Sequence, residues 1–385
     1  MTTQGASPSG RLTSLDVFRG ATIAGMNLVN NPGDWGKIYA PFKHAAWNGW
    51  TFTDTIFPFF LWIVGVAMTF SFAKRIERGD DKKKLFTHVV IRAAGIFAVG
   101  LFLSGFPFGL AFGHQFSFAT IRIPGVLQRI AVCYLISSAI FLSTGIAGQI
   151  RWIVSLLGIY WLVMKMIPVP GFGAGVLDPT GNLCWYIDSN VLAGHTWSGA
   201  PVPGFDPEGI FSTIPAIATT LFGVLTGHLL RVNTTREEKT VWMFIAGSVL
   251  MLVGLVMDNW LPINKNLWTS SYSVFMAGLA SICFAFCYWI IDVKGYKKWS
   301  KPFEIYGLNA LTMFFLAGFF GRLTGVIKWT DVEGAMISLK TFYYRLLFVP
   351  IADPMNASFL HSLFYVAFLY VIAYVMYRKK WFLRF

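Results

Sequence analysis

Charged residues are scarce in this sequence: they account for 13% of its 385 residues, whereas about a quarter of the residues of a soluble domain are charged. Cysteine is also scarce. The four cysteines, at positions 133, 184, 283 and 287, show no metal-type spacing with a histidine nearby. The low charge argues against a soluble globular domain, and the cysteine spacing predicts no metal site.

Several sequence signatures of enzymes are absent. The chain contains no Walker A loop, no GxSxG elbow, no HExxH and no CxxC pair. Its formal net charge of +13 would suit a nucleic-acid-binding protein, but the basic residues stand in short clusters between apolar stretches. That distribution is typical of membrane proteins, whose positive loops lie against anionic lipid headgroups. We therefore expect a lipid bilayer, and no nucleic acid, as partner.

Long apolar stretches are abundant, and 55% of the residues are hydrophobic. Stretches of about 20 residues can cross a bilayer as helices and are too long for the strands of a β-barrel. We expect an all-α, polytopic integral membrane bundle, a single domain over residues 1–385 with about ten transmembrane helices. The expected spans are 14–30, 51–73, 86–104, 123–144, 152–167, 209–230, 240–260, 268–291, 304–320 and 357–377. A further hydrophobic piece, 336–351, is expected to form a re-entrant or surface helix.

The positions of Lys and Arg predict the orientation. Nineteen fall on one side of the expected spans: Arg11, Lys74, Arg75, Arg78, Lys82, Lys83, Lys84, Arg151, Arg231, Arg236, Lys239, Lys294, Lys297, Lys298, Lys301, Arg378, Lys379, Lys380 and Arg384. Eight fall on the other: Lys37, Lys43, Arg122, Lys265, Arg322, Lys328, Lys340 and Arg345. Because the more basic side faces the cytoplasm, both termini are expected there. The loop 168–208 is then external, and serves either as a lid or sugar-binding surface or as a plain connector.

The segment Lys43–Phe60, KHAAWNGWTFTDTIFPFF, gives the strongest functional signal. It places His44 and Asp54 against an apolar run, where ionisable groups are costly and mark a functional site by default. An imidazole suits proton transfer or nucleophilic attack at neutral pH. Asp54 could orient it, although ten residues intervene, and Trp47 and Asn48 crowd around it. A structural role for the histidine is the alternative.

Other polar residues stand near the ends of the expected spans. Asn30 is joined to His44 by a loop with prolines and glycines that could bring the two together; helix capping is the alternative. Asp16 and Arg19 lie three residues apart on one helix face near the inner surface. They form either a structural ion pair or an anchor for a phosphate. Asn309 lies within the ninth expected span.

Two further clusters carry polar groups that membrane packing does not require. In IRIPGVLQR (121–129), Arg122, Gln128 and Arg129 bracket the start of the fourth span. Arg129 lies inside the apolar run, where a charge needs a buried partner or an aqueous cavity. In PINKNLW (262–268), Asn264 and Lys265 lie on the outer side and suit a carbohydrate. Anchoring at the membrane interface is the competing interpretation.

Six segments occur in a distinctive order: RLTSLDVFRG (11–20), FKHAAWNG (42–49), RIPGVLQR (122–129), PEGIFSTI (207–214), INKNLW (263–268) and IDVKG (291–295). Together they resemble the heparan-α-glucosaminide N-acetyltransferase family, transmembrane enzymes that act on terminal glucosamine. The resemblance implies acetyl-CoA as co-substrate on the cytoplasmic side. It implies glucosamine or a glucosamine-terminated oligosaccharide as acceptor on the periplasmic or luminal side.

The residue types and this resemblance together predict the site. His44 aligns with the family's catalytic histidine and would carry the acetyl group or act as general base. Asn30 aligns with an asparagine near it, and Asp54 completes the predicted catalytic set. The other predicted site residues are Trp47, Asn48, Asn264 and Lys265 for the acceptor, and Arg19, Arg122, Gln128, Arg129 and Asn309 for acetyl-CoA.

The resemblance also bears on location and on the acceptor. Lysosomal members carry an extra luminal domain before the first matching segment, whereas this sequence starts at the match. That favours a bacterial inner membrane, with free glucosamine or short oligosaccharides as acceptors and a homodimer as a candidate assembly. The rival hypothesis is a transporter for an amino sugar such as N-acetylglucosamine. Discontinuous helices and inverted repeats would favour it, and no inverted repeat is evident in the sequence.

Overall fold

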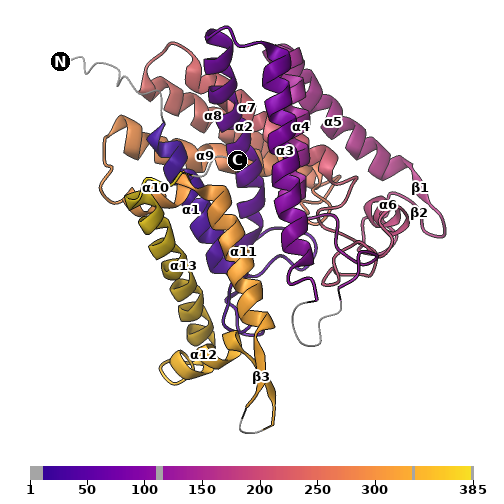
Figure 1. The fold of residues 1–385 in the computed structure, drawn as a ribbon. Helices are drawn as coiled ribbons and strands as arrows, with labels where there is room; N and C mark the ends of the chain where they lie inside the picture. The colour runs from indigo at the N-terminus through magenta and orange to yellow at the C-terminus, as the bar shows by residue number, and fades with distance from the viewer. Residues whose placement is uncertain (1–11, 110–115, 332–333, 383–385) are drawn as a thin grey trace.

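The computed structural model describes residues 12–109, 116–331 and 334–382, which form an all-α bundle (Figure 1). The predicted fold class is therefore confirmed. The long helices are α1 (Thr13–Asn30), α2 (Phe52–Glu77), α3 (Lys82–Gly105), α4 (Val126–Ser143), α5 (Ile146–Met166), α7 (Thr213–Arg231), α8 (Arg236–Asp258), α9 (Ser270–Tyr288), α11 (Ala310–Val326) and α13 (Pro354–Arg378). The shorter elements are the 3₁₀ turn η1 (Ala40–Phe42), α6 (Leu183–Val191), the π-helical turn η2 (Trp289–Val293), α10 (Lys301–Leu308), α12 (Leu339–Leu347) and the strands β1 (Pro168–Val169), β2 (Gly173–Ala174), β3 (Lys328–Thr330) and β4 (Met336–Ser338).

The helices match the expected membrane spans. Within the described residues, eight helices are long and apolar enough to cross a membrane: α2, α3, α4, α5, α7, α8, α9 with η2, and α13. A ninth span, predicted as 304–320, is broken at Asn309, where α10 and α11 meet at an angle of 83°. The remaining expected span is α1, which is too polar to qualify by composition alone. It packs against α2, α9, α10 and α13, so protein rather than lipid covers its polar groups.

The bundle has a buried centre and a lipid-facing periphery. The most apolar stretch of α2 is 78% buried within the protein, whereas that of α8 is only 22% buried. At the centre, Trp62 is fully buried. Its ring lies 6.1 Å from that of Phe18 and 5.4 Å from that of Phe284, which belong to α1 and α9. The N-terminal end of α2, which carries Asp54, is therefore held by the most constrained helix of the bundle.

Glycines bring α2 and α7 into close contact. Gly65 lies against the backbone of Thr220, and Gly223 lies against the backbone of Trp62. A Cβ atom placed on Gly223 would fall 2.0 Å from the carbonyl oxygen of Trp62. Close backbone approach at small residues is a recurring way of packing helices in membranes, and here it leaves no room for a methyl group.

Gly223→Ala is therefore expected to destabilise the protein by about 1–3 kcal/mol, because the added methyl group forces the two backbones apart. The measurement is the midpoint of thermal unfolding in detergent. Gly158→Ala on α5, where an added Cβ meets nothing within 4 Å, is the matched control and should not lower the midpoint. If both variants unfolded at the same temperature as the parent, the close contact would be disproved.

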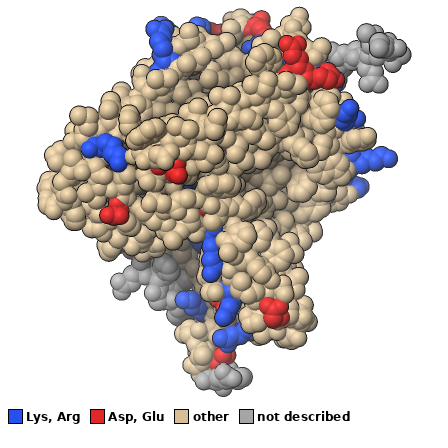
Figure 2. Space-filling model, turned by 180° about the vertical axis from the view of Figure 1, so that it is seen from behind, with Lys and Arg blue, Asp and Glu red and all other residues tan. Residues whose placement is uncertain are grey.

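The two ends of the bundle differ in charge. One end, uppermost in Figure 1, collects the basic connections and is called the basic end below; it carries residues 78–81, 232–235, 294–300 and 379–382. The opposite end, called the loop end, carries residues 31–51, 167–212, 259–269, 327–331 and 334–353. Arg11 and Arg384, which belong to the predicted basic side, lie outside the described residues. The compartment that each end faces stays a prediction. Figure 2 shows basic and acidic side chains together along the upper margin, basic ones in a furrow of the lower half, and a mostly uncharged surface between.

The predicted external loop 168–208 is a folded layer at the loop end. It contains the β1–β2 hairpin and α6. Its side chains form a small core with α5 and with residues 261–267: Tyr160, Met164, Val169, Leu183, Cys184, Phe205, Leu261 and Leu267. The piece predicted as 336–351 forms β4 and the short helix α12 at the same end. These layers surround the residues that the sequence singled out.

Candidate active site

His44 and Asp54 are in direct contact at the loop end. The Nδ1 atom of His44 lies 2.5 Å from Oδ1 of Asp54, although ten residues separate them along the chain. The side chain of His44 is 51% exposed, whereas that of Asp54 is 1% exposed. The pair therefore joins an accessible imidazole to a buried carboxylate.

The first turn of α2 explains why Asp54 is held in this position. Thr51 is the N-cap of α2 and forms a capping box with Asp54. The backbone N–H groups of Thr51 and Ala45 each donate to Oδ2 of Asp54 at 3.0 Å. The hydroxyl of Tyr272 on α9 donates to the backbone carbonyl of Asp54 at 2.5 Å. Oδ2 is thus engaged by the backbone, and Oδ1 faces the histidine.

This arrangement determines what the imidazole can do. An ionised carboxylate only accepts hydrogen bonds, so Nδ1 of His44 carries the proton and Nε2 carries a free lone pair. The negative charge of Asp54 is favourable at the N-terminus of α2 because of the helix dipole. No hydrogen bond from the described residues engages Nε2. Nε2 can therefore accept a proton or attack an electrophilic carbonyl.

The loop that carries His44 is fastened to the rest of the loop end. Nε1 of Trp47 donates to the carbonyl of Leu177 at 2.9 Å. Nδ2 of Asn264 donates to Oδ1 of Asn48 at 3.0 Å, and Oδ1 of Asn264 accepts from the backbone N–H of Leu267 at 2.8 Å. Asn264, which was predicted to bind the acceptor, is fully buried. Its two side-chain hydrogen bonds join the loop of His44 to the loop that precedes α9. Asn48 is exposed.

Lys265 and Arg122 meet through two acidic residues. Arg122 donates from Nε and NH2 to both oxygens of Asp206, at 2.8 and 2.6 Å. Its NH2 also donates to Glu208 at 2.5 Å. Nζ of Lys265 lies 3.9 Å from Glu208. Burial alone would raise the pKa of Glu208, but the charges of Lys265 and Arg122 outweigh it and bring the pKa down to about 2.

Asp206 and Glu208 were not predicted as site residues. The segment PEGIFSTI (207–214) was among those that carry the family resemblance, so a signal was present. Their partner Arg122 lies more than eighty residues earlier in the chain, and nothing local in the sequence points to the contact.

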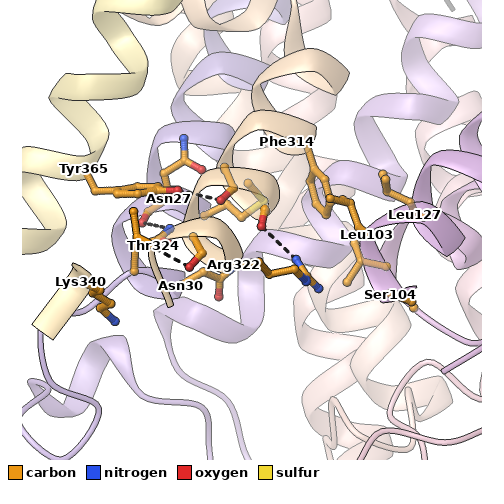
Figure 3. Close-up of a pocket in the computed structure, with 18 of the residues that line it drawn as sticks. Asn27, Asn30, Leu103, Ser104, Leu127, Phe314, Arg322, Thr324, Lys340 and Tyr365 are labelled. Carbon is orange, nitrogen blue, oxygen red and sulfur yellow. Dashed lines mark hydrogen bonds between the residues drawn. The ribbon is translucent and has the colours of Figure 1, made fainter. Parts of the chain in front are cut away.

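A cavity of about 360 Å³ lies at the loop end, between α1, α3, α4, α11, α12 and α13 (Figure 3). Asn30, Arg122 and Gln128 line it, so the structure brings a residue predicted to be catalytic together with two predicted to bind acetyl-CoA. His44 is not among its lining residues. We expected the loop between Asn30 and His44 to bring the two residues together. Among the described residues they share neither a cavity wall nor a hydrogen bond.

Gln128 and Arg129 are adjacent but face different surroundings. Gln128 lies so close to α3 that a Cβ atom on Gly100 would fall 2.3 Å from its Oε1. Arg129 points into the protein, where NH2 donates to the carbonyl of Gly209 at 3.1 Å and to the hydroxyl of Ser212. Its guanidinium carbon lies 5.1 Å from the ring centre of Trp268. Arg129 was expected to have a buried partner or an aqueous cavity, and its hydrogen-bond partners are buried neutral groups. Its Nε and NH1 have no hydrogen-bond partner among the described residues.

Arg19 and Asn309 do not line the cavity, although Met26 on α1 and Phe314 on α11 do. Arg19 pairs with Asp16 at 3.2 Å and donates to the carbonyl of Gly307 on α10 at 3.3 Å. Nδ2 of Asn309 donates to the carbonyl of Trp381 at 3.0 Å. Of the residues predicted to bind acetyl-CoA, Arg122 and Gln128 therefore line the cavity, and Arg19 and Asn309 lie outside it. Within the described residues, no cluster of His, Cys, Asp or Glu is arranged to hold a metal ion.

A buried carboxylate in the folded layer titrates near neutral pH. Asp188 on α6 is fully buried, and its Oδ1 accepts from the backbone N–H of Ile210 at 3.0 Å. Burial raises the pKa of Asp188 from 3.8 to about 7. Between these values the unfolded chain loses this proton and the folded protein keeps it. The stabilisation is therefore full below about pH 3.8 and is lost as the pH rises toward about 7.

Asp188→Asn is expected to flatten this pH dependence and to raise the unfolding temperature relative to the parent most strongly above about pH 7. The measurement is thermal unfolding in detergent at several values between about pH 5 and about pH 8. Asp178→Asn, an exposed position in the same segment, is the control and should keep the slope of the parent. An unchanged slope in Asp188→Asn would show that Asp188 is ionised throughout.

Comparisons with known proteins identify the family. A family model described as heparan-alpha-glucosaminide N-acetyltransferase, catalytic, matches residues 11–263. The human protein named heparan-alpha-glucosaminide N-acetyltransferase is 30% identical over 353 residues, covering 79% of this chain and 52% of the human protein. The mouse protein of the same name is 30% identical over 357 residues, covering 80% of this chain and 53% of its own. The chain spans about half the length of these curated relatives. It belongs to the heparan-alpha-glucosaminide N-acetyltransferase family, as the order of its motifs predicted.

Proposed function

We propose that this integral membrane protein is an N-acetyltransferase that moves an acetyl group from acetyl-CoA to the amine of glucosamine or of a glucosamine-terminated oligosaccharide. The observation that carries the proposal is the His44–Asp54 pair, with Nδ1 bound to a carboxylate and Nε2 free at an exposed position. Family membership supports the reaction class, since the relatives are named for N-acetyl transfer to a glucosaminide.

Two routes use the free Nε2 of His44. As a general base, Nε2 takes a proton from the ammonium or attacking amine, whose lone pair then displaces the CoA thiolate from the acetyl carbonyl. As a nucleophile, Nε2 attacks the thioester, releases the CoA thiol and carries the acetyl group until the amine accepts it. In both routes Asp54 keeps the proton on Nδ1 and stabilises the positive charge that develops on the ring.

The remaining predicted residues lie apart from the His44–Asp54 pair or in the loop beside it. Arg19 at the basic end offers a cation to the phosphates of acetyl-CoA, in line with a cytoplasmic donor. Arg122 and Gln128 line the cavity at the loop end and, as residues predicted for acetyl-CoA, would contact the donor there. Trp47 and Asn48 lie in the loop of His44, and Lys265 is near enough for its charge to act on Asp54; all three carry groups that suit a sugar.

The test uses purified protein in detergent with labelled acetyl-CoA and glucosamine, with mass spectrometry of the product. Formation of labelled N-acetylglucosamine by the parent supports the proposal. In sealed proteoliposomes with acetyl-CoA outside and glucosamine inside, product in the lumen would support transfer across the membrane. No product with glucosamine or with short glucosamine-terminated oligosaccharides, from folded protein, would refute the enzymatic function.

Transport of an amino sugar is the second candidate, and one observation favours it. The span formed by α10 and α11 is broken at Asn309 with a bend of 83°, and broken helices are common at transporter binding sites. Uptake of labelled N-acetylglucosamine into proteoliposomes without acetyl-CoA would favour this function. Uptake that never exceeds that of empty liposomes would exclude it. A bacterial inner membrane and a homodimer, both suggested by the resemblance, form part of the proposal.

A further inference from the structure

Lys265 lies in a loop that is paired with the segment carrying His44. The backbone N–H of Gly49, in that segment, donates to the carbonyl of Ile263 at 2.7 Å. Gly49 also forms a parallel β-bridge with Asn264, the residue before the lysine. The two loops are distant in the sequence and run side by side at the loop end.

The loop of Lys265 ends at a strained residue. The φ angle of Trp268 is +50°, a left-handed conformation that a bulky residue rarely adopts. The Trp268 side chain is fully buried, and its indole N–H donates to the hydroxyl of Thr219 on α7 at 3.2 Å. Its backbone N–H donates to the carbonyl of Lys265 at 3.1 Å. Such strain persists only where the surrounding structure fixes it, so the backbone of Lys265 is held in place.

The side chain of Lys265 is directed at buried carboxylates rather than at solvent. It is 15% exposed, and its Nζ lies 3.9 Å from Oε1 of Glu208. The charge of Lys265 also acts on Asp54. Both carboxylates are buried, so salt and water screen these interactions less than they would at the surface. One of the two carboxylates belongs to the proposed catalytic pair.

The hydroxyl of Tyr272 marks the region that the two carboxylates share. It donates to the backbone carbonyl of Asp54 at 2.5 Å. The charges of Asp54 and Glu208 both act on this hydroxyl, although the two residues belong to segments far apart in the chain. Because the region is compact and buried, a change of charge at Glu208 or Lys265 reaches the carboxylate of Asp54.

Two other titratable groups lie nearby. Lys43 precedes His44 in the chain, and its side chain is exposed, so water and salt screen its charge. Asp188 titrates near neutral pH, and the charges that act on it include those of Asp206 and Arg129. Variants at positions 43 and 188 therefore serve as controls below.

We propose that Lys265 is a positioning residue that acts on His44 through Asp54: Glu208 anchors its ammonium, and the positive charge offsets part of the negative charge of Asp54. Asp54 alone favours the imidazolium, which can neither accept a proton nor attack a carbonyl. The lysine restores the balance in favour of a neutral imidazole with Nε2 free. The inference rests on the acetyltransferase function proposed above and gives Lys265 a role other than contact with the acceptor.

The first test reads the protonation of His44 without turnover. Diethyl pyrocarbonate reacts with a neutral imidazole and not with an imidazolium, and His44 is half exposed with Nε2 free. The full chain in detergent is treated briefly over a series of pH values. Mass spectrometry of the His44 peptide then gives the pH at which its rate of reaction is half-maximal, called the midpoint below.

The two partners are expected to move this midpoint in opposite directions. In Lys265→Met it should rise by about 0.5 to 1 pH unit, because loss of a nearby cation favours the imidazolium. In Glu208→Gln it should fall by a similar amount, because the charge of Lys265 is then unbalanced. Asp206 still pairs with Arg122 in Glu208→Gln, so this variant should fold, and either variant alone tests the sign.

Three control variants and one internal reference isolate the effect of the buried charge. Lys265→Arg keeps the charge and should keep the midpoint of the parent. Lys43→Met removes an exposed lysine beside the histidine, and it should shift the midpoint by about 0.2 pH unit or less. Asp188→Asn should also leave it in place. The exposed His88 on α3 is read in the same spectra and should react alike in every variant.

The second test measures turnover with glucosamine over the same pH series. The acid limb of kcat/KM should move with the midpoint in each variant. Well above the midpoint, Lys265→Met should keep kcat within about threefold of the parent and leave KM for glucosamine unchanged. General damage to the structure would lower kcat at every pH, so this measurement separates it from an effect of charge.

Three results would overturn the proposal. The Lys265→Met variant could keep the midpoint of the parent. Lys265→Met and Glu208→Gln could shift it in the same direction. Lys265→Met could raise KM for glucosamine at every pH without moving the midpoint, which would make Lys265 an acceptor-binding residue instead. If the midpoints move as expected but no amino sugar is acetylated, the proposed function fails and the action of Lys265 on His44 stands.

Discussion

His44→Ala is expected to lower kcat for acetyl transfer by about 100-fold to 10,000-fold, the range that a positioned general base contributes, and further if the acetyl group is carried covalently. The side chain of His44 is half exposed, and within the part of the chain that the structure describes its one hydrogen bond is to Asp54. Its loss should therefore change the unfolding temperature little. Initial rates with labelled acetyl-CoA and glucosamine, at saturating concentrations of both, give the ratio of kcat values.

The matched control is His88→Ala, which removes an exposed histidine of α3 at the opposite end of the bundle. It should keep the rate of the parent. Mass spectrometry of protein quenched in the presence of acetyl-CoA alone separates the two routes, since only the covalent route leaves an acetyl group on His44. A His44→Ala variant that turns over like His88→Ala would remove His44 from the mechanism.

Arg122→Gln is expected to destabilise the protein by about 3–5 kcal/mol, the cost of leaving buried charges without their partner. The change strands Asp206, which is fully buried, and Glu208, which is 8% exposed. Lys265 remains 3.9 Å from Glu208 and compensates only in part. The midpoint of thermal unfolding in detergent should fall well below that of the parent.

Two further variants test this explanation of the Arg122 effect. Arg345→Gln removes an equally basic but exposed side chain of the loop end and should leave the midpoint near that of the parent. Adding Asp206→Asn to Arg122→Gln removes one stranded charge, so the double variant should be more stable than Arg122→Gln alone. A double variant that is less stable than the single one would show that the carboxylate has another essential partner.

The spans could be predicted from the sequence because length and hydrophobicity alone identify a membrane helix. It also singled out His44 and Asp54, since both stand beside an apolar run, where ionisable groups are costly. The break at Asn309 was less visible: glycines and an asparagine occur there, but the bend of 83° depends on how α10 packs against α1.

Residues joined over long distances escaped prediction for a physical reason. Asp206 and Glu208 can be recognised as partners of Arg122 only in the folded protein, where residues 168–208 bring them into contact with it. Likewise, Arg322 and Lys340 reach the same cavity as Asn30 although about three hundred residues separate them from it. Propensity and hydropathy describe neighbours in the chain, whereas these contacts follow from tertiary packing.

The two carboxylate oxygens of Asp54 form hydrogen bonds with different neighbours. Oδ2 accepts from the backbone around the start of α2, and Oδ1 contacts His44. Any substitution at this position therefore alters folding and chemistry together, and a fall in activity alone cannot be assigned to either. His44→Ala removes the contact to Oδ1 and leaves the backbone hydrogen bonds to Oδ2, so the two effects can be measured apart. Few side chains at position 54 could both cap α2 and hold the proton on Nδ1 of His44, so this residue couples the start of the helix to the reactivity of the imidazole.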